Sequence, residues 1–235
     1  MPVMAALPEG ELPAGLDGAA IVAELAARGA MSLPFLGDGL RRALLAEAEG
    51  YPYQPSRRVV GSGENLVVQE LVWFDALPES SLFWTFKDAV QALFDRAFAP
   101  LDPYPFATPL VFNEVMLQRY DTGSRGITPH RDHISYINLV CLFVLAGEGR
   151  FVVTADRAGR APHAVDGRPG RAILMRAPGF QGSTFRPFHA VGDITATRYV
   201  FGLRHEDPPG AKAERARLRL TAGPEKAAVA GPAEP

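Results

Sequence analysis

Residues 111–146 read VFNEVMLQRYDTGSRGITPHRDHISYINLVCLFVLA, and this stretch decides the fold. Its short apolar or alternating runs are separated by Asp, Gly and Pro, which is typical of strands joined by turns. The same texture continues to residue 204. The predicted strands span residues 111–120, 127–132, 137–146, 150–155, 172–176, 185–191 and 194–204, with a further one inside 66–74. About seven or eight short strands of this kind indicate a sandwich or a barrel.

Three amphipathic helices are expected before this region. Asp17 can cap a helix that runs to about residue 28, and a second helix spans residues 38–49. Ser80 or Ser81 opens a third helix, which ends near residue 98 and carries an apolar stripe with a period of 3.6 residues. Such a stripe packs on a sheet, so the helices would cover one sheet face. The expected fold class is α+β.

Length and composition fit one domain with mobile ends. The chain has 235 residues, of which 47% are hydrophobic, enough for a substantial core. The ends are rich in Pro, Ala and Gly. We therefore predict a flexible N-terminus at residues 1–16, a single domain at 17–205 with its core at 109–205, and a flexible tail at 206–235.

Several classes of protein are disfavoured. A net charge of −2 with scattered basic residues argues weakly against a dedicated nucleic-acid binder. No apolar run approaches the roughly 18 residues of a membrane span, and no secretory signal is visible. Cys141 is the single cysteine, so an internal disulfide is excluded. A cytoplasmic protein without a membrane partner is the expectation.

Three potential metal ligands stand out. His130 and Asp132 are two residues apart on a predicted strand, so their side chains share one face. His189 lies on a later strand that can return to the same cavity. Two imidazoles and one carboxylate suit Fe(II) with open coordination positions. Each residue alone would more often be an ordinary core or surface residue, and the metal site is indicated by the combination.

Four polar residues on neighbouring strands accompany these ligands. Arg198 and Arg204 are an even number of residues apart on the last strand, so both project from one face. Buried guanidinium groups need an anionic partner, and a dicarboxylate could satisfy both. Structural salt bridges to Asp or Glu are the alternative. Gln118 and Tyr120, two apart, could add hydrogen bonds to the same ligand.

These segments together resemble the Fe(II)/2-oxoglutarate-dependent oxygenases, and most of all their AlkB-like group. The matching pieces are Gln118-Arg119-Tyr120, His130-Arg131-Asp132, His189 and the run RYVFGLR at residues 198–204. The resemblance covers residues 111–204. In three places the chain departs from the AlkB-like pattern: Gln118 stands for Asn, Val200 for Asn and Gly202 for Thr. These departures leave the iron assignment intact and weaken an assignment to alkylated-base repair.

The resemblance implies a double-stranded β-helix, or jelly roll, with the helices packed on one sheet face. It implies that His130, Asp132 and His189 bind Fe(II) and are catalytic. Arg198 would pair with the distal carboxylate of the co-substrate 2-oxoglutarate, Arg204 with its other carboxylate, and Tyr120 would donate a hydrogen bond to it. Halogenases of this superfamily lack the ligand carboxylate. Because Asp132 is present, hydroxylation or oxidative dealkylation, with release of succinate and CO2, is expected.

The substrate contacts are less defined. Residues beside the predicted site or in the segment before the core are the candidates: Arg131, His133, Tyr136, Asn138, Arg57, Arg58 and Trp73. Trp73 lies in an apolar strand, where a tryptophan is more often core than a stacking platform, and the odd spacing of His133 from Asp132 points His133 to the other strand face. A small organic substrate is expected. The alternatives are an AlkB-like dealkylase of bases in single-stranded nucleic acid and a non-catalytic metal-binding jelly roll.

Overall fold

The structure is a computed structural model and describes residue 7 and residues 10–209. The helices are α1 (Gly18–Arg28), α2 (Asp38–Glu49) and α3 (Leu82–Phe98), and a short 3-10 helix lies at Gly63–Asn65. All three predicted helices are confirmed. As expected, the Asp17 side chain caps α1 by accepting from the Ala20 amide, and Ser81 caps α3. No helix in residues 10–209 is long and apolar enough to cross a membrane.

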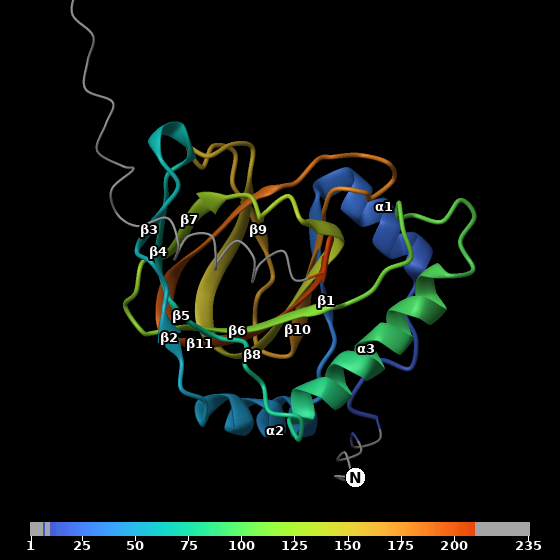
Figure 1. The fold of residues 1–235 in the computed structure, drawn as a ribbon, viewed down its shortest axis with the longest axis horizontal. Helices are drawn as coiled ribbons and strands as arrows, with labels where there is room; N and C mark the ends of the chain where they lie inside the picture. The colour runs from blue at the N-terminus through green and yellow to red at the C-terminus, as the bar shows by residue number, and fades with distance from the viewer. Residues whose placement is uncertain (1–6, 8–9, 210–235) are drawn as a thin grey trace, which may run out of the picture.

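The strands form two antiparallel sheets that share their two longest members (Figure 1). The strands are β1 (Ala30–Pro34), β2 (Gln54–Pro55), β3 (Val59–Val60), β4 (Val67–Glu70), β5 (Val72–Phe74), β6 (Glu114–Tyr120), β7 (Gly126–His130), β8 (Tyr136–Thr154), β9 (His163–Val165), β10 (Arg171–Arg176) and β11 (Phe188–Glu206). The larger sheet has the strand order β1-β10-β8-β11-β6-β5-β2, and β8 contributes its first half and β11 its second half to it. Their other halves pair with β9 and β7, and β4 and β3 extend that second sheet. This is a jelly-roll-like arrangement.

The predicted strand boundaries were wrong at two bends. Residues 137–146 and 150–155 form the single strand β8, and residues 185–191 and 194–204 merge into β11 from residue 188. Gly147 sits at the bend of β8 with a φ of 85°, and a Cβ there would lie 2.2 Å from the carbonyl oxygen of Thr197. A glycine therefore lets β8 bend between the sheets without ending, where the sequence pattern indicates a turn.

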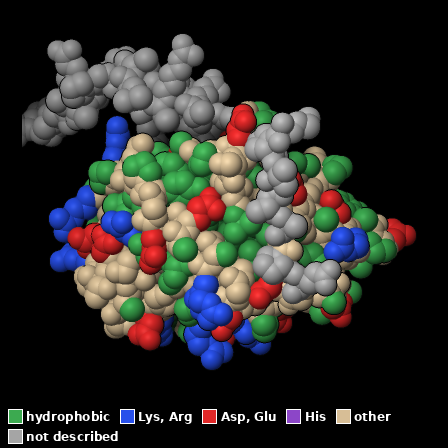
Figure 2. All heavy atoms as spheres, turned by 90° about the horizontal axis from the view of Figure 1, so that it is seen from below, with side chains coloured by type: hydrophobic (Ala, Val, Ile, Leu, Met, Phe, Trp, Pro, Cys, Tyr) green, Lys and Arg blue, Asp and Glu red, His purple; other side chains and the backbone are tan. Residues whose placement is uncertain are grey.

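Two apolar cores lie on opposite faces of the larger sheet. One joins the three helices to this sheet through aromatic side chains such as Phe86, Phe143 and Phe201. The other fills the space between the two sheets and includes Tyr120 and Val200. The helices thus cover one outer face, as predicted. Figure 2, which views the molecule from below, shows acidic and basic side chains interspersed on that side.

Residues just outside the predicted domain limits of 17–205 make ordered contacts with it at both ends. The Glu11 side chain accepts a hydrogen bond from the amide of Leu40 in the first turn of α2, so part of the predicted flexible N-terminus is held in place. At the other end, Glu206 is buried in β11, and the amide of Asp207 donates to the Ser135 carbonyl. The remainder of the predicted ends, residues 1–6, 8–9 and 210–235, lies outside the described residues.

Candidate active site

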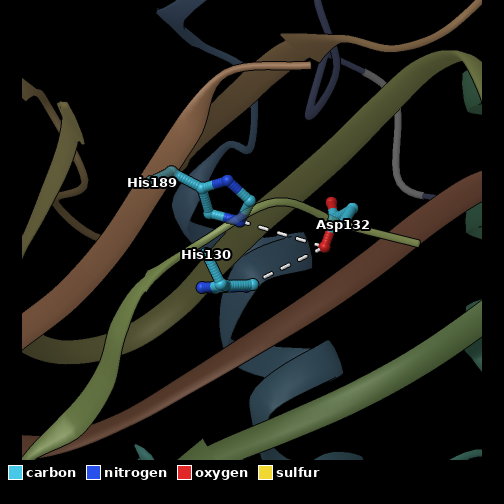
Figure 3. Close-up of side chains that lie close together, drawn as sticks. All are labelled: His130, Asp132 and His189. Atoms are coloured by element: carbon cyan, nitrogen blue, oxygen red, sulfur yellow. Dashed lines mark ion pairs between the residues drawn. The ribbon is translucent and has the colours of Figure 1, made fainter. Parts of the chain in front are cut away.

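The side chains of His130, Asp132 and His189 lie close together (Figure 3), and their potential ligand atoms are within 4.8 Å of one another. His130 ends β7, Asp132 follows it in the next loop, and His189 begins β11. The Nε2 atoms of His130 and His189 lie 4.0 Å and 3.9 Å from Oδ1 of Asp132. The structure brings the three predicted ligands together, although β7 ends at His130, so Asp132 lies in a loop and not in the predicted strand 127–132.

Both imidazoles are oriented by the main chain. Nδ1 of His130 donates to the carbonyl oxygen of Thr128 at 3.0 Å, and Nδ1 of His189 donates to that of Pro187 at 3.3 Å. With Nδ1 as the donor, Nε2 of each neutral ring carries the lone pair and is free to bind a metal. A backbone carbonyl behind the ring is the usual second partner of a metal-binding histidine.

The charge states also suit a cation. Burial, together with the charge of neighbouring His189, lowers the pKa of His130 to about 4, so its imidazole is neutral at pH 7. Burial alone would raise the pKa of Asp132, but the charges of His189 and Arg204 outweigh this effect and hold it below its usual value. A neutral imidazole at His130 and an ionised carboxylate at Asp132 are the forms in which these groups bind a divalent metal.

Arg198 is buried without a carboxylate partner. It is 1% exposed, and its Nη1 donates to the carbonyl oxygen of Gly167 at 2.7 Å, while its Nε has no hydrogen-bond partner. Within the described residues, no Asp or Glu oxygen lies within 4.0 Å of this guanidinium group. Burial lowers the pKa of Arg198, and a buried cation of this kind is costly unless an anion joins it. This orphaned charge fits the distal carboxylate of a keto diacid.

Arg204 already has an acidic partner. Its Nη1 lies 2.9 Å from Oε2 of Glu114, and both side chains are nearly inaccessible to solvent. Its guanidinium group also lies over the ring of Tyr136, 5.2 Å from the centroid. This is the structural salt bridge that the sequence left open as the alternative to a co-substrate contact.

The remaining predicted co-substrate residues share the face of Arg198. The register of β6 with β11 pairs Tyr120 with Arg198 and Gln118 with Val200, so their side chains point into the space between the sheets. Tyr120 is buried there, and burial raises its pKa to about 12. Trp73 on β5 pairs with Gln118 and is half-buried on the same face.

Two of the substrate candidates lie at the triad and one does not. Tyr136 lines a small cleft beside Asp132 and His189, with a volume of about 10 Å³. Arg131 is exposed next to it, with its guanidinium carbon 4.1 Å from the centroid of the Phe188 ring. Asn138 has a φ of 62°, which interrupts the alternation of β8, and its amide donates to the Thr108 carbonyl instead of facing the cleft.

The other three candidates are exposed. Nδ1 of His133 lies 3.0 Å from the hydroxyl of Ser135 in the loop after Asp132. Arg57 and Arg58 lie between β2 and β3, and Arg58 borders a separate surface groove lined by β4, β5 and residues 121–124. The structure therefore does not bring Arg57 or Arg58 to the triad cleft.

Sequence reasoning missed several neighbours of the triad. Arg186 donates to the backbone carbonyl of Asp132, and the ring of Phe151 stacks on His189 with a centroid distance of 5.6 Å. Sequence reasoning also missed Glu114, the partner of Arg204. Glu114 lies an even number of residues before Gln118 and Tyr120 on β6, so this spacing could have placed its side chain on the same face as theirs, opposite Arg204. Arg186 lies in an irregular segment, and no periodicity signals its position.

Comparison with known proteins shows a likeness of fold. No protein-family model and no curated protein sequence matches the chain. Among solved structures, a Pseudomonas putida prolyl-4-hydroxylase superposes with a TM-score of 0.54 at 19% identity, covering 81% of this chain and 100% of that one. A Trichoplax adhaerens prolyl hydroxylase, solved with a hypoxia-inducible-factor peptide, gives 0.58 at 15% identity, covering 85% and 91%. A 2OG-Fe(II) oxygenase-family protein of Burkholderia pseudomallei gives 0.54 at 18% identity, covering 83% and 92%.

The chain therefore has the double-stranded β-helix fold of the 2-oxoglutarate- and Fe(II)-dependent oxygenases, as expected, with a His-Asp-His triad in it. The reported matches are mainly prolyl hydroxylases, and they do not show an AlkB-like grouping. The donor set and the unpaired Arg198 both fit the metal and the dicarboxylate that such a fold implies.

Proposed function

We propose that this protein is an Fe(II)- and 2-oxoglutarate-dependent dioxygenase that hydroxylates or oxidatively dealkylates a small organic substrate. The observation that carries the proposal is the conjunction of two features of the strands and loops around the space between the sheets. One is a triad of two backbone-oriented imidazoles and an ionised carboxylate. The other is a buried arginine on the same strand as His189, with no carboxylate partner among the described residues. A metal held only for stability needs no such arginine.

Each residue has a defined task in this proposal. His130, Asp132 and His189 hold the metal on one side, which leaves its other positions open. Arg198 binds the distal carboxylate of 2-oxoglutarate, and Tyr120 hydrogen-bonds it within the apolar space between the sheets. When bound, the metal and the keto acid supply the oxygen chemistry, which yields succinate, CO2 and an oxidised substrate. The surrounding apolar side chains exclude water from the site.

Nucleic-acid base dealkylation, the AlkB-like alternative, is less well supported. It rests on the sequence pattern of the last strand, in which Arg204 would take a co-substrate carboxylate. Arg204 is instead neutralised by Glu114 at 2.9 Å. Two of the structural matches are prolyl hydroxylases. At 15–19% identity they support the fold of this chain and do not indicate its substrate.

His130→Ala tests the proposal directly. We expect the variant to lose Fe(II) stoichiometry and all succinate formation from 2-oxoglutarate, because a two-ligand site binds the metal poorly. The wild type should form succinate in the presence of Fe(II), oxygen and at least one member of a panel of small organic compounds. Iron content is measured by metal analysis and succinate by chromatography.

His163→Ala is the matched control. This histidine lies on β9, is exposed and contacts Arg28, so its loss should leave both readouts unchanged. Full iron content in His130→Ala would contradict the ligand assignment. Iron binding by the wild type without succinate from any compound would favour the non-catalytic jelly roll.

A further inference from the structure

We propose that the substrate carries an anionic group, a carboxylate or a phosphate, which a rim of three arginines binds beside the triad. The basic rim consists of Arg131, Arg157 and Arg186. The inference rests on the proposed function, because it names the class of substrate for that site.

Contacts place the three arginines around the metal ligands. Arg186 lines the cleft with Asp132 and His189 and donates to the Asp132 carbonyl. The guanidinium carbons of Arg131 and Arg157 lie 4.1 Å and 5.4 Å from the ring centroid of Phe188, the residue before His189. The positive charge of Arg157 helps to lower the pKa of His130, and that of Arg131 helps to lower the pKa of Arg186. One rim thus gathers side chains from three separate loops.

The charges of Arg131 and Arg186 repel each other, and none of the three arginines forms a salt bridge within the described residues. Other arginines of the domain, such as Arg119, Arg168 and Arg171, form salt bridges with a nearby Asp. Among the described residues, no carboxylate oxygen lies within 4.0 Å of any of the three rim guanidinium groups. Nη1 of Arg157 is buried and has no hydrogen-bond partner. Like charges held together without a counter-ion are unfavourable, so an arriving anion would gain from all of them.

The surroundings favour a small organic anion over a nucleic acid. Exposed apolar side chains stand beside the rim residues or their contacts along the chain: Ile134 is three residues after Arg131, Phe185 precedes Arg186, and Leu66 follows Asn65, whose side chain meets Arg157. A nucleic-acid backbone needs positive charge along a track, whereas Arg57 and Arg58 lie apart from the rim and the net charge is −2. An anion with an apolar body would match both the three arginines and these exposed apolar side chains.

Binding of matched probes tests the proposal without knowledge of the natural substrate. The full chain is loaded with Zn(II) and saturated with 2-oxoglutarate, so that Arg198 is occupied, and calorimetry measures benzoate, phenyl phosphate and their neutral counterpart benzamide. We expect one or both anions to bind, benzamide to bind at least about tenfold more weakly, and Arg131→Gln/Arg157→Gln to weaken the anions by about tenfold or more. Whichever anion binds more tightly identifies the headgroup.

The control is Arg42→Gln/Arg96→Gln, which removes two exposed positive charges from α2 and α3 and should change nothing. If the rim double variant does not fold, Arg131→Gln alone replaces it, because Arg131 is exposed and packs only its guanidinium group on a ring. Unchanged zinc content shows that the triad is intact in either variant.

Three results would overturn the proposal: no anion binds the wild type, the anions bind the rim variant as tightly, or benzamide binds equally well. Salt-dependent binding of an eight-nucleotide oligothymidylate in place of the small anions would also overturn it, in favour of the nucleic-acid alternative. If a neutral compound supports succinate formation and no anion is preferred, the role of the rim in substrate binding is refuted and the proposed function still holds. If anions bind at the rim but no compound supports succinate formation, the rim is an anion site and the proposed function is refuted.

Discussion

At the scale of single residues, the two arginines of the last strand differ in what surrounds them. Both are buried on the same face of β11, as their even spacing predicts. Arg198 meets a carbonyl oxygen, whereas Arg204 meets the carboxylate of Glu114. Residue type and spacing are the same for both, so the sequence alone could not separate the ligand-binding arginine from the structural one.

Arg198→Ala should weaken 2-oxoglutarate binding by at least about tenfold and leave iron binding nearly unchanged. The reason is that a charge-assisted pair in a buried site is lost, while the metal ligands lie elsewhere on the strands. Calorimetry with the metal-loaded protein measures this. Arg168→Ala, at an exposed guanidinium group, is the control. Equal co-substrate affinity in the wild type and Arg198→Ala would refute the anchoring role.

Glu114→Gln should lower the free energy of unfolding by about 3–5 kcal/mol, because it leaves the Arg204 charge buried and unpaired. Urea denaturation measures the change. The exposed Glu24, which pairs with Arg28 one helical turn away, offers a control in Glu24→Gln, where a loss below about 0.5 kcal/mol is expected. An unchanged stability in Glu114→Gln would mean that Arg204 does not depend on this partner and is available to the co-substrate.

At the scale of elements, the helices were predictable and the strand boundaries were not. The caps Asp17 and Ser81 and the apolar stripes act locally, so they can be read from sequence. The breaks expected near Gly147 and Gly192 are bends, because pairing with neighbours on both sides carries β8 and β11 through them. Such pairing is a long-range property. The spacing of His130 and Asp132 predicted that they lie together, even though Asp132 lies in the loop after β7, whereas the basic rim comes from three loops and has no such spacing.

Gly147→Ala should destabilise the fold by roughly 1–3 kcal/mol or more. A side chain at a φ of 85° is strained, and its Cβ would collide with the Thr197 carbonyl oxygen at 2.2 Å. Thermal or urea unfolding measures the loss.

Gly159→Ala separates the two contributions. Gly159 has a similar φ of 78°, but a Cβ there would make an ordinary contact of 3.6 Å with Pro129. Its loss should therefore be limited to backbone strain. Equal losses in the two variants would show that the close approach of β8 and β11 at the bend is not rigid.

At the scale of the whole molecule, the helical layer and the candidate site lie on opposite faces of the larger sheet. The aromatic core under the helices carries much of the buried apolar surface, and the site occupies the separate space between the sheets (Figure 1). Stability and ligand binding are thus supplied largely by different layers, and the ligands should add to a fold that already exists without them.

Metal and 2-oxoglutarate together should raise the melting temperature. A ligand at 100 times its dissociation constant adds about 2.7 kcal/mol to the stability of the folded state. For a domain of this size that corresponds to a shift of roughly 5–10 °C. Differential scanning fluorimetry with Zn(II), with and without 2-oxoglutarate, measures it. His130→Ala should lose the metal-dependent shift, and equal melting temperatures for the wild type in all conditions would count against binding.

The hydrogen bonds behind the two imidazoles have an evolutionary consequence. Both rings are aimed by carbonyl groups two positions earlier, at Thr128 and Pro187, and a carbonyl is present whatever side chain stands there. The orientation of the two imidazole rings therefore depends on the path of the main chain, and the side chains at positions 128 and 187 can change without altering it. A ligand geometry secured in this way can persist while the neighbouring side chains change.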